Sequence, residues 1–304
     1  MVAVAVGPEG SPQWAADAIR SGGGTVTVTD YAGADGLVWI DFDRVDELGR
    51  VLARHPGIRW VQLPWAGVER FAHLFDTSRK WTSAKGVFGP AVAELALGML
   101  LGGLRHIVAY SRLSSWSEDH GVNLVGARVV IVGGGGIAES LAAMLVPFGC
   151  HVTVVRKRVQ PMVNVHEVVG QDDLDRVLPG ADAVVLALAL TAETVGMFSR
   201  SQFDLMQPHA WIVNVARGRH IVTDDLVDAL RRGSIGGAAL DVTDPEPLPK
   251  GHPLWSMHNC FITPHVGNTA DMVPGLLSVR IADNVRRLAQ GDDLVGVIDV
   301  ELGY

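Results

Sequence analysis

The sequence is poor in cysteine and in basic residues. Only Cys150 and Cys260 occur among 304 residues, and they form no CxxC pair. A disulfide framework and a cysteine-based zinc site are therefore not expected, and we predict no metal. Lysine and arginine number 25 against 33 acidic residues, which gives a net charge of −8. This balance argues against nucleic acid or an anionic membrane as a partner.

Long apolar runs are also missing. The most apolar stretch, residues 95–104, is far shorter than the ~20 residues needed to span a bilayer. No basic residue precedes Arg20, so the amino terminus does not resemble a secretory signal. We therefore expect a cytoplasmic protein. The motifs GxxxxGK[ST], GxSxG and HExxH are absent as well, which removes the phosphate-loop, serine-hydrolase and zincin interpretations.

What the chain does contain is enough apolar sequence for two cores. Hydrophobic residues make up 48% and charged residues 19%, and the length suggests about two domains. Short apolar runs alternate with helix-length segments, as expected for parallel α/β sheets. Strands are predicted at 2–6, 25–29, 36–40, 58–63, 81–83, 128–132, 151–155, 183–188, 211–215, 238–242 and 261–263. Helices are predicted at 12–20, 43–54, 138–148, 174–178, 200–206 and 224–232, the last with Thr223 as its cap.

Two further helices organise the domains. Residues 91–108 predict a long buried linking helix, and residues 274–290 predict a last helix that returns to the first unit. The expected fold is α/β, with two Rossmann-like or flavodoxin-like doubly wound parallel-sheet domains and a cleft between them. The expected domains are a discontinuous substrate domain, 1–92 plus 275–304, and a dinucleotide-binding domain, 93–274.

A glycine-rich turn carries the strongest local signal. Val129–Val132 is followed by four glycines, Gly133 to Gly136, and then by Ile137-Ala138. The pattern G-x-G-x-x-G/A after a strand and before a helix is typical of dinucleotide binding. Its first glycine makes the turn, the second admits a pyrophosphate to the backbone, and the third position lets the helix pack against the strand. A flexible glycine loop is the alternative.

The next strand indicates which dinucleotide is used. About twenty residues after the turn, a carboxylate is expected for the ribose 2′-hydroxyl. The sequence has Arg156, Lys157 and Arg158 instead. Guanidinium groups bind a 2′-phosphate by charge-assisted hydrogen bonds. We therefore predict NADPH rather than NADH, with a solvated basic turn as the alternative.

Three polar residues follow predicted strands, where ligands of doubly wound sheets bind. Arg217 can pair with a carboxylate and polarise the adjacent keto oxygen. His265 can donate a proton to that oxygen. Glu246, hydrogen-bonded to the imidazole, would orient it and favour imidazolium. Each residue alone has an ordinary structural explanation, but together they predict carbonyl reduction.

These motifs together resemble the D-2-hydroxyacid dehydrogenase family, from about residue 93 to residue 283. The basic cluster and the segment Gly-His-Pro-Leu-Trp at 251–255 look most like the NADPH-linked glyoxylate/hydroxypyruvate reductase branch. The resemblance implies reduction of a small 2-oxo acid to a 2-hydroxy acid by a homodimer. The sequence departs from the family pattern at two positions. Ala189 stands where proline is common, and a large aromatic, Trp65, stands in the loop that binds the substrate carboxylate in this family.

The resemblance also implies roles for particular residues. It makes Arg217, Glu246 and His265 catalytic, and Asp241 a partner of the nicotinamide amide. The loop 63–68 would hold the substrate carboxylate through its backbone, with Trp65, Ala66, Gly67, Arg217 and His265 as substrate-binding candidates. With the motifs above, the candidate cofactor-binding residues are Gly133, Gly135, Gly136, Ile137, Arg156, Lys157, Arg158, Leu188, Val215, Ala216, Arg217, Asp241 and His265.

Other functions stay open at this point. A non-catalytic NAD(P)-binding regulatory protein would share the fold, as do transcriptional corepressors that resemble this family. Phosphoglycerate dehydrogenase is disfavoured by the basic cluster. Formate dehydrogenases of this type have glutamine where Glu246 stands. The sequence leaves undetermined the particular 2-oxo acid and the physiological direction.

Overall fold

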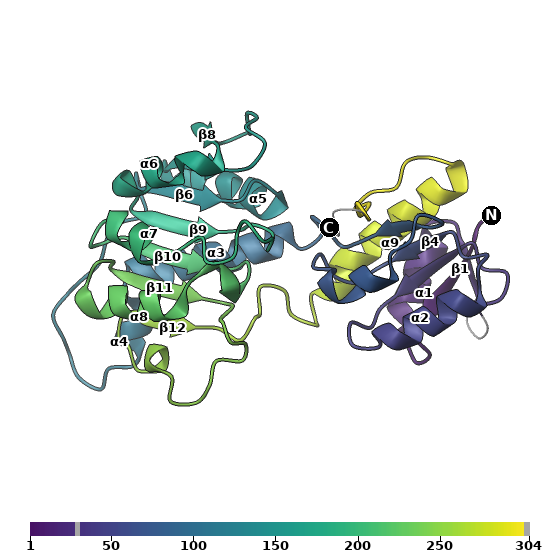
Figure 1. The fold of residues 1–304 in the computed structure, drawn as a ribbon, viewed down its shortest axis with the longest axis horizontal. Helices are drawn as coiled ribbons and strands as arrows, with labels where there is room; N and C mark the ends of the chain where they lie inside the picture. The colour runs from purple at the N-terminus through teal and green to yellow at the C-terminus, as the bar shows by residue number, and fades with distance from the viewer. Residues whose placement is uncertain (28–30, 301–304) are drawn as a thin grey trace. The chain divides into compact units, whose positions relative to one another are not determined.

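The computed structural model describes residues 1–27 and 31–300, and the chain forms two compact units (Figure 1). The first unit is residues 1–88 together with the chain from 269 onward, and the second is residues 89–268. The expected boundaries lie at 92/93 and 274/275, a few residues later. Both units are parallel α/β sheets, as the sequence predicts.

The first unit is built on a parallel sheet in the flavodoxin-like order β2-β1-β3-β4-β5. Its strands are β1 (Ala3–Gly7), β2 (Thr25–Thr27), β3 (Gly36–Trp39), β4 (Trp60–Gln62) and β5 (Lys80–Thr82). Residues 28 and 29 of the expected strand 25–29 lie outside the described residues. The accompanying helices are α1 (Gln13–Ser21), α2 (Val45–Arg54), the 3-10 helix η1 (Glu69–Leu74) and α9 (Val273–Gln290).

The carboxyl-terminal helix α9 belongs to this unit because of both apolar and polar contacts. Leu277, Ile281 and Val285 bury one face of it. On the same helix Asn284 is fully buried, and its amide donates to Gln62 Oε1 at 3.0 Å and to the Val295 carbonyl at 2.9 Å. Gln62 Oε1 also accepts the Thr82 hydroxyl at 2.9 Å. Buried polar groups need such partners. This network therefore holds helix α9 against strands β4 and β5 of the first sheet.

The second unit has a parallel sheet in the order β12-β11-β10-β9-β6-β7-β8, the Rossmann arrangement with one added strand. The strands are β6 (Arg128–Val132), β7 (His151–Val155), β8 (Glu167–Val169), β9 (Ala183–Leu186), β10 (Trp211–Asn214), β11 (Gly237–Leu240) and β12 (Cys260–Ile262). Strand β8 was not among the strands predicted from the sequence. It has only three residues and a single fully buried side chain, so its apolar signal is too short to detect.

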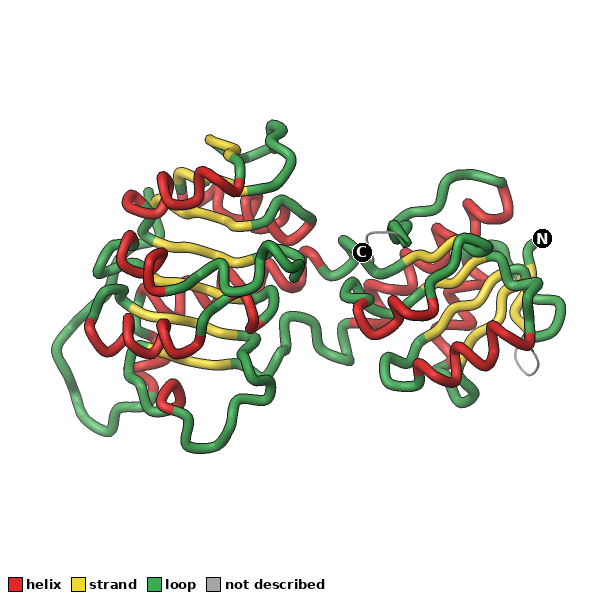
Figure 2. Tube along the Cα trace, viewed as in Figure 1, coloured by secondary structure: helices red, strands yellow, loops and turns green. Residues whose placement is uncertain are grey.

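Helices cover both faces of this sheet (Figure 2). They are α3 (Gly89–Leu104), α4 (Ile107–Ser111), α5 (Gly136–Leu145), α6 (Leu174–Val177), α7 (Arg200–Leu205) and α8 (Thr223–Arg232), with 3-10 turns η2 (Val146–Phe148), η3 (Gln171–Asp173), η4 (Leu178–Gly180), η5 (Gly218–His220) and η6 (Pro253–Trp255). Successive strand residues point to opposite faces. Val130 and Ile212 therefore pack with α6, α7 and α8, whereas Val129 and Val213 pack with α3 and α5.

Two helix predictions need correction. The predicted linking helix 91–108 is interrupted, because His106 adopts a left-handed conformation with φ 51° between α3 and α4. Thr223 does not cap α8. Val222 occupies the N-cap position without a side-chain hydrogen bond, and the Thr223 hydroxyl donates instead to the Asp244 carbonyl at 2.8 Å. Within the described residues, no helix combines the length and apolarity of a membrane span.

Candidate active site

The glycine-rich turn joins β6 to α5 at the carboxyl edge of the second sheet. Gly133 has φ +116°, and a Cβ there would lie 2.2 Å from the Ala187 carbonyl oxygen. Only glycine fits such a position. A Cβ at Gly135, in contrast, would meet nothing within 4 Å. The turn is thus packed on its protein side and open beside Gly135, where α5 begins.

This geometry fits a bound dinucleotide. The first intrahelical bond of α5 runs from Glu139 N to the Gly135 carbonyl at 3.0 Å, so the preceding amides of the first turn have no acceptor within the helix. Amides at a helix N-terminus attract phosphate. Ala138 is fully buried, as expected of the small residue that lets the helix pack closely on the sheet. A pyrophosphate could be held by the backbone of Gly135, Gly136 and Ile137.

The basic cluster begins at the end of β7, next to the same turn. Arg156 is partly buried, and a Cβ on Gly134 would lie 2.7 Å from its Cδ and Nε atoms. Lys157 and Arg158 are exposed. Within the described part of the chain none of the three forms an ion pair with a carboxylate. Arg156 therefore lies against the glycine-rich turn, and two exposed cationic residues follow it in the chain.

The turn that carries Arg217 follows β10 and is fixed by a buried side chain. Asn214 is fully buried; its amide donates to the Arg217 carbonyl at 2.9 Å, and its oxygen accepts from Ala216 N at 3.0 Å. The Arg217 guanidinium donates to the Ala216 carbonyl at 2.8 Å. Val215 and Ala216 are buried beneath this turn. Asn214 thus determines the backbone from which Arg217 projects.

Glu246 and His265 come from different strand ends and meet directly. Glu246 Oε1 lies 2.7 Å from His265 Nδ1, and the two side chains are 43% and 51% exposed. With the proton on Nδ1, the imidazole donates to the carboxylate, which fixes the ring orientation and leaves Nε2 for proton exchange. The two residues are 19 positions apart in the sequence, so their contact depends on the tertiary fold.

Asp241, which directly follows β11, holds the backbone around His265. Its carboxylate is 3% exposed and accepts the Thr263 hydroxyl at 2.6 Å, Val266 N at 2.8 Å and Gly267 N at 2.9 Å. His265 N also donates to the Asp241 carbonyl at 2.9 Å, while His265 has φ 54°. A non-glycine residue adopts this conformation only where its surroundings impose it. This positioning contact was not predicted from the sequence, because the partners of Asp241 lie more than twenty positions away and no local motif indicates them.

Trp65, Ala66 and Gly67 belong to the other unit, in the loop after β4. The Trp65 ring lies 5.4 Å from the Phe88 ring, centroid to centroid, and its carbonyl accepts Ala84 N at 3.0 Å. Ala66 is exposed. The loop is therefore anchored at Trp65 and open at the residue that follows.

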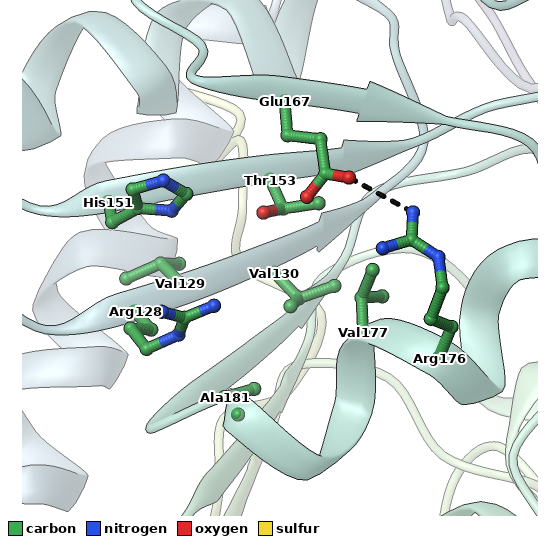
Figure 3. Close-up of a pocket in the computed structure, with 10 residues that line it drawn as sticks. Arg128, Val129, Val130, His151, Thr153, Glu167, Arg176, Val177 and Ala181 are labelled. Atoms are coloured by element: carbon green, nitrogen blue, oxygen red, sulfur yellow. Dashed lines mark hydrogen bonds and ion pairs between the residues drawn. The ribbon is translucent and has the colours of Figure 1, made fainter.

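Two hollows lie along the second sheet, and they differ in position. One lies at the amino-terminal ends of β6 and β7 and is lined by Arg128, His151 and Thr153, with Arg176 bonded to Glu167 at 3.0 Å across its rim (Figure 3). It contains none of the predicted catalytic residues. The other is smaller and lies between the Arg217 turn and the segment before Glu246, lined in part by Asn214, Gly218 and Thr243.

Comparison with known proteins identifies the family. A family model described as "D-isomer specific 2-hydroxyacid dehydrogenase, NAD binding domain" matches residues 97–267. The chain belongs to this family. It is therefore an NAD(P)-dependent oxidoreductase of the 2-hydroxyacid dehydrogenase class, with a nicotinamide cofactor.

Individual relatives support the same placement along the whole chain. Glyoxylate/hydroxypyruvate reductase A of Photorhabdus laumondii is 32% identical, with 84% of each chain covered. The mouse glyoxylate reductase/hydroxypyruvate reductase is also 32% identical, over 86% of this chain and 82% of the mouse protein. An uncharacterized Corynebacterium melassecola protein is 36% identical over 94% of this chain and 95% of its own length.

Solved structures of the family have the same fold. The D-isomer specific 2-hydroxyacid dehydrogenase of Xanthobacter autotrophicus, in complex with NADPH and MES, superimposes with a TM-score of 0.85 at 26% identity, covering 100% of this chain and 99% of that one. The NADPH-dependent glyoxylate/hydroxypyruvate reductase of Sinorhizobium meliloti, in complex with NADP and sulfate, gives 0.82 at 25% identity with both chains fully covered. The match to these structures therefore extends over the full length of the chain.

Proposed function

We propose that this dehydrogenase reduces small 2-oxo acids of the glyoxylate/hydroxypyruvate kind to 2-hydroxy acids, with NADPH as the preferred cofactor. The observation that carries the proposal is the 2.7 Å contact between Glu246 Oε1 and His265 Nδ1. The contact orients the imidazole, and the proposal is supported by His265, Arg217 and the glycine-rich turn all following strands of the second sheet. Such a set suits proton transfer to a carbonyl oxygen.

The three side chains have separate tasks in this proposal. The Arg217 guanidinium pairs with the substrate carboxylate and polarises the neighbouring keto oxygen. His265 Nε2 gives that oxygen its proton, while Glu246 holds the ring through Nδ1. When bound, NADPH supplies the hydride. In the oxidative direction His265 takes the proton back, and Arg217 holds the same carboxylate.

The cofactor preference rests on the position of the basic cluster. Arg156 packs over Gly134 in the phosphate-binding turn, and Lys157 and Arg158 follow it in the exposed loop. Guanidinium and ammonium groups favour a 2′-phosphate, and no carboxylate pairs with them in the described residues. Asp241, with Leu188, Val215 and Ala216, remains our proposed contact for the nicotinamide end. The loop at Trp65, Ala66 and Gly67 remains our proposed backbone donor to the substrate carboxylate.

We also propose that the enzyme is a homodimer. Ile107, Leu113 and Trp116, in and after α4, are exposed apolar side chains, and Trp116 is fully exposed. These side chains are close together in the chain, and contiguous exposed apolar surface marks protein interfaces. Sedimentation velocity of the purified enzyme would show a species of twice the 32.4 kDa chain mass. A monomer at micromolar concentration would contradict this assignment.

A substrate screen tests the central proposal. NADPH oxidation would be followed by absorbance with glyoxylate, hydroxypyruvate, phenylpyruvate and branched 2-oxo acids, and repeated with NADH. We expect turnover with the smaller acids and a higher kcat/KM with NADPH. Tight NADPH binding without turnover on any acid would instead support a non-catalytic regulatory protein. Turnover with equal or better efficiency on NADH would overturn the cofactor preference alone.

A further inference from the structure

His220 is a buried imidazole that the proposed mechanism does not use. It ends the 3-10 turn η5, three residues after Arg217, and its side chain is 0% exposed. Its Nδ1 lies 3.0 Å from the Thr194 carbonyl oxygen, and its Nε2 lies 3.3 Å from the Leu188 carbonyl oxygen. Both oxygens belong to the loop between β9 and α7. A single side chain therefore connects that loop to the turn that carries Arg217.

The protonation of this ring determines which carbonyl it can bind. Burial lowers the pKa of His220, and the charge of Arg217 lowers it further, against the raising effect of the two carbonyls. The ring is therefore neutral near pH 7 and carries one N–H. We assign that proton to Nδ1, which makes the shorter of the two contacts and then donates to Thr194 O. The Leu188 carbonyl then faces the unprotonated Nε2.

Thr194, which His220 contacts, is itself bonded to other residues of the loop. Its side chain is 4% exposed, and its hydroxyl donates to the Ala189 carbonyl at 3.0 Å and accepts from Thr191 N at 2.8 Å. The loop therefore folds around Thr194, which is the residue that His220 holds. Backbone bonds from Gly196 N to Arg219 O at 2.8 Å and from Phe198 N to His220 O at 2.9 Å run beside it.

The other end of the loop lies against the glycine-rich turn. Ala187 N donates to the Val132 carbonyl at 2.8 Å, and a Cβ on Gly133 would lie 2.2 Å from the Ala187 carbonyl oxygen. The loop from 187 to 194 thus has one end at the proposed phosphate-binding turn and the other at His220. The contact between Thr194 and the imidazole is the side-chain part of what holds the loop near Arg217, beside the backbone bonds at Gly196 and Phe198.

We propose that His220 is a positioning residue, whose Nδ1–H bond to Thr194 fixes the loop 188–194 between the glycine-rich turn and Arg217. The consequence of this His220 contact for catalysis rests on the proposed function. The loop forms one wall of the cofactor site, and Arg217 anchors the substrate. The imidazole then supports the spacing between the two, together with the backbone bonds at Gly196 and Phe198. An apolar residue of similar size would fill the same space and leave the Thr194 carbonyl without a donor, at the cost of a buried unpaired group.

Three variants separate this role from simple space filling. His220→Asn keeps a donor near the Nδ1 position, His220→Gln keeps one near the Nε2 position, and His220→Leu keeps volume alone. The first measurement is hydrogen exchange of peptides covering 187–198 in the protein without ligands. We expect faster exchange at the Thr191 and Thr194 amides in the Gln and Leu variants, and exchange close to wild type in the Asn variant.

The second measurement is steady-state kinetics with the cofactor that the wild-type enzyme uses. We expect the Gln and Leu variants to raise KM for the cofactor roughly 3- to 10-fold, the value of one hydrogen bond, with kcat changed less than about 2-fold. The Asn variant should restore KM. Wild-type exchange and KM in the Gln variant, or an Asn variant as impaired as Leu, would overturn the proposal.

Failure of the proposed function is distinguishable from failure of this inference. A wild-type protein that turns over no 2-oxo acid would refute the former, while hydrogen exchange in the ligand-free variants would still decide the latter. If His220→Leu does not fold, the contrast between Asn and Gln remains. Both carry the same amide group, and the extra methylene of Gln puts the donor farther from the backbone than in Asn.

Discussion

Gly218 lies directly against the carbonyl group of Thr243. A Cβ on Gly218 would be 1.9 Å from that oxygen and 2.0 Å from its carbon, so no other residue fits without moving the backbone. Gly218 follows Arg217, and Thr243 N donates to Glu246 Oε2 at 3.4 Å. The contact therefore sets how the arginine turn and the glutamate segment approach one another.

Substitution of this glycine should damage catalysis without removing any catalytic group. In Gly218→Ala the added methyl group must displace the Arg217 turn, and we expect kcat/KM to fall by about 10²-fold, the cost of a misplaced catalytic group. Steady-state kinetics would measure it. Gly275→Ala is the matched control, because a Cβ there meets nothing within 4 Å. Unchanged kcat/KM in Gly218→Ala would show that the turn tolerates displacement.

Removal of the imidazole should stop proton transfer. His265→Ala should lower kcat by ~10²-fold or more if Nε2 donates the proton. Glu246→Gln keeps the shape of the pair and should lower kcat by ~10-fold or more, because the amide cannot support a charged ring as the carboxylate does. Stopped-flow or steady-state absorbance of NADPH would report both. Turnover near the wild-type rate in His265→Ala would exclude it as the donor.

Loss of the basic cluster should change cofactor choice. The double variant Arg156→Ala, Arg158→Ala should raise KM for NADPH by ~10- to 100-fold, the value of charge-assisted hydrogen bonds to a phosphate. KM for NADH should change less than about 2-fold, since NADH lacks that phosphate. Arg54→Ala, an exposed arginine of the first unit, is the control. A parallel rise for both cofactors would mean that the cluster supports the turn rather than the phosphate.

The network around Asn284 should dominate the stability of the first unit. Asn284→Ala leaves Val295 O and Val295 N without the Asn284 side chain as partner and removes one of the two hydrogen bonds to Gln62 Oε1. We expect the free energy of unfolding to fall by about 2–4 kcal/mol. Urea unfolding followed by tryptophan fluorescence would measure it. Gln290→Ala, exposed near the end of the same helix, should change little, and an equal loss there would contradict the argument.

Acid should weaken one bond of the first sheet. The backbone N–H of Ala3 and the Arg59 guanidinium bond Asp35 at 3.1 and 3.0 Å, and they lower the pKa of its carboxyl below the usual value. A lowered pKa in the folded state means that ionised Asp35 stabilises the fold above the unfolded pKa. This contribution disappears as pH falls through the folded value.

The variant Asp35→Asn tests that pH dependence. It should lower the urea midpoint at pH 7, where wild-type Asp35 is ionised. The difference from wild type should shrink at a pH well below the ordinary carboxyl value of 3.8, as the wild-type carboxyl becomes protonated. Urea titrations at both pH values would measure the two midpoints. A difference that stays constant with pH would show that charge at Asp35 does not contribute.

Local patterns predicted most of the elements, because each depends on neighbours within one turn or one strand. The strands at 128–132 and 151–155 match β6 and β7 residue for residue, since a strand buried on both faces is a continuous apolar run. The break at His106 and the short strand β8 were not predictable in this way. Each depends on packing against distant segments, and neither has the glycine, proline or apolar length that marks such features locally.

The sequence by itself determined the family of structures and the chemical inventory: parallel sheets, a glycine turn after a buried strand, and an arginine, a glutamate and a histidine after later strands. Only the tertiary structure decided how these residues are held. Asp241 gathers the backbone at 263–267 around His265, Gly218 abuts Thr243, and Asn284 binds Gln62 across 222 positions. Such contacts join residues far apart in the chain, and their geometry is set by the burial of whole sheets rather than by any local pattern.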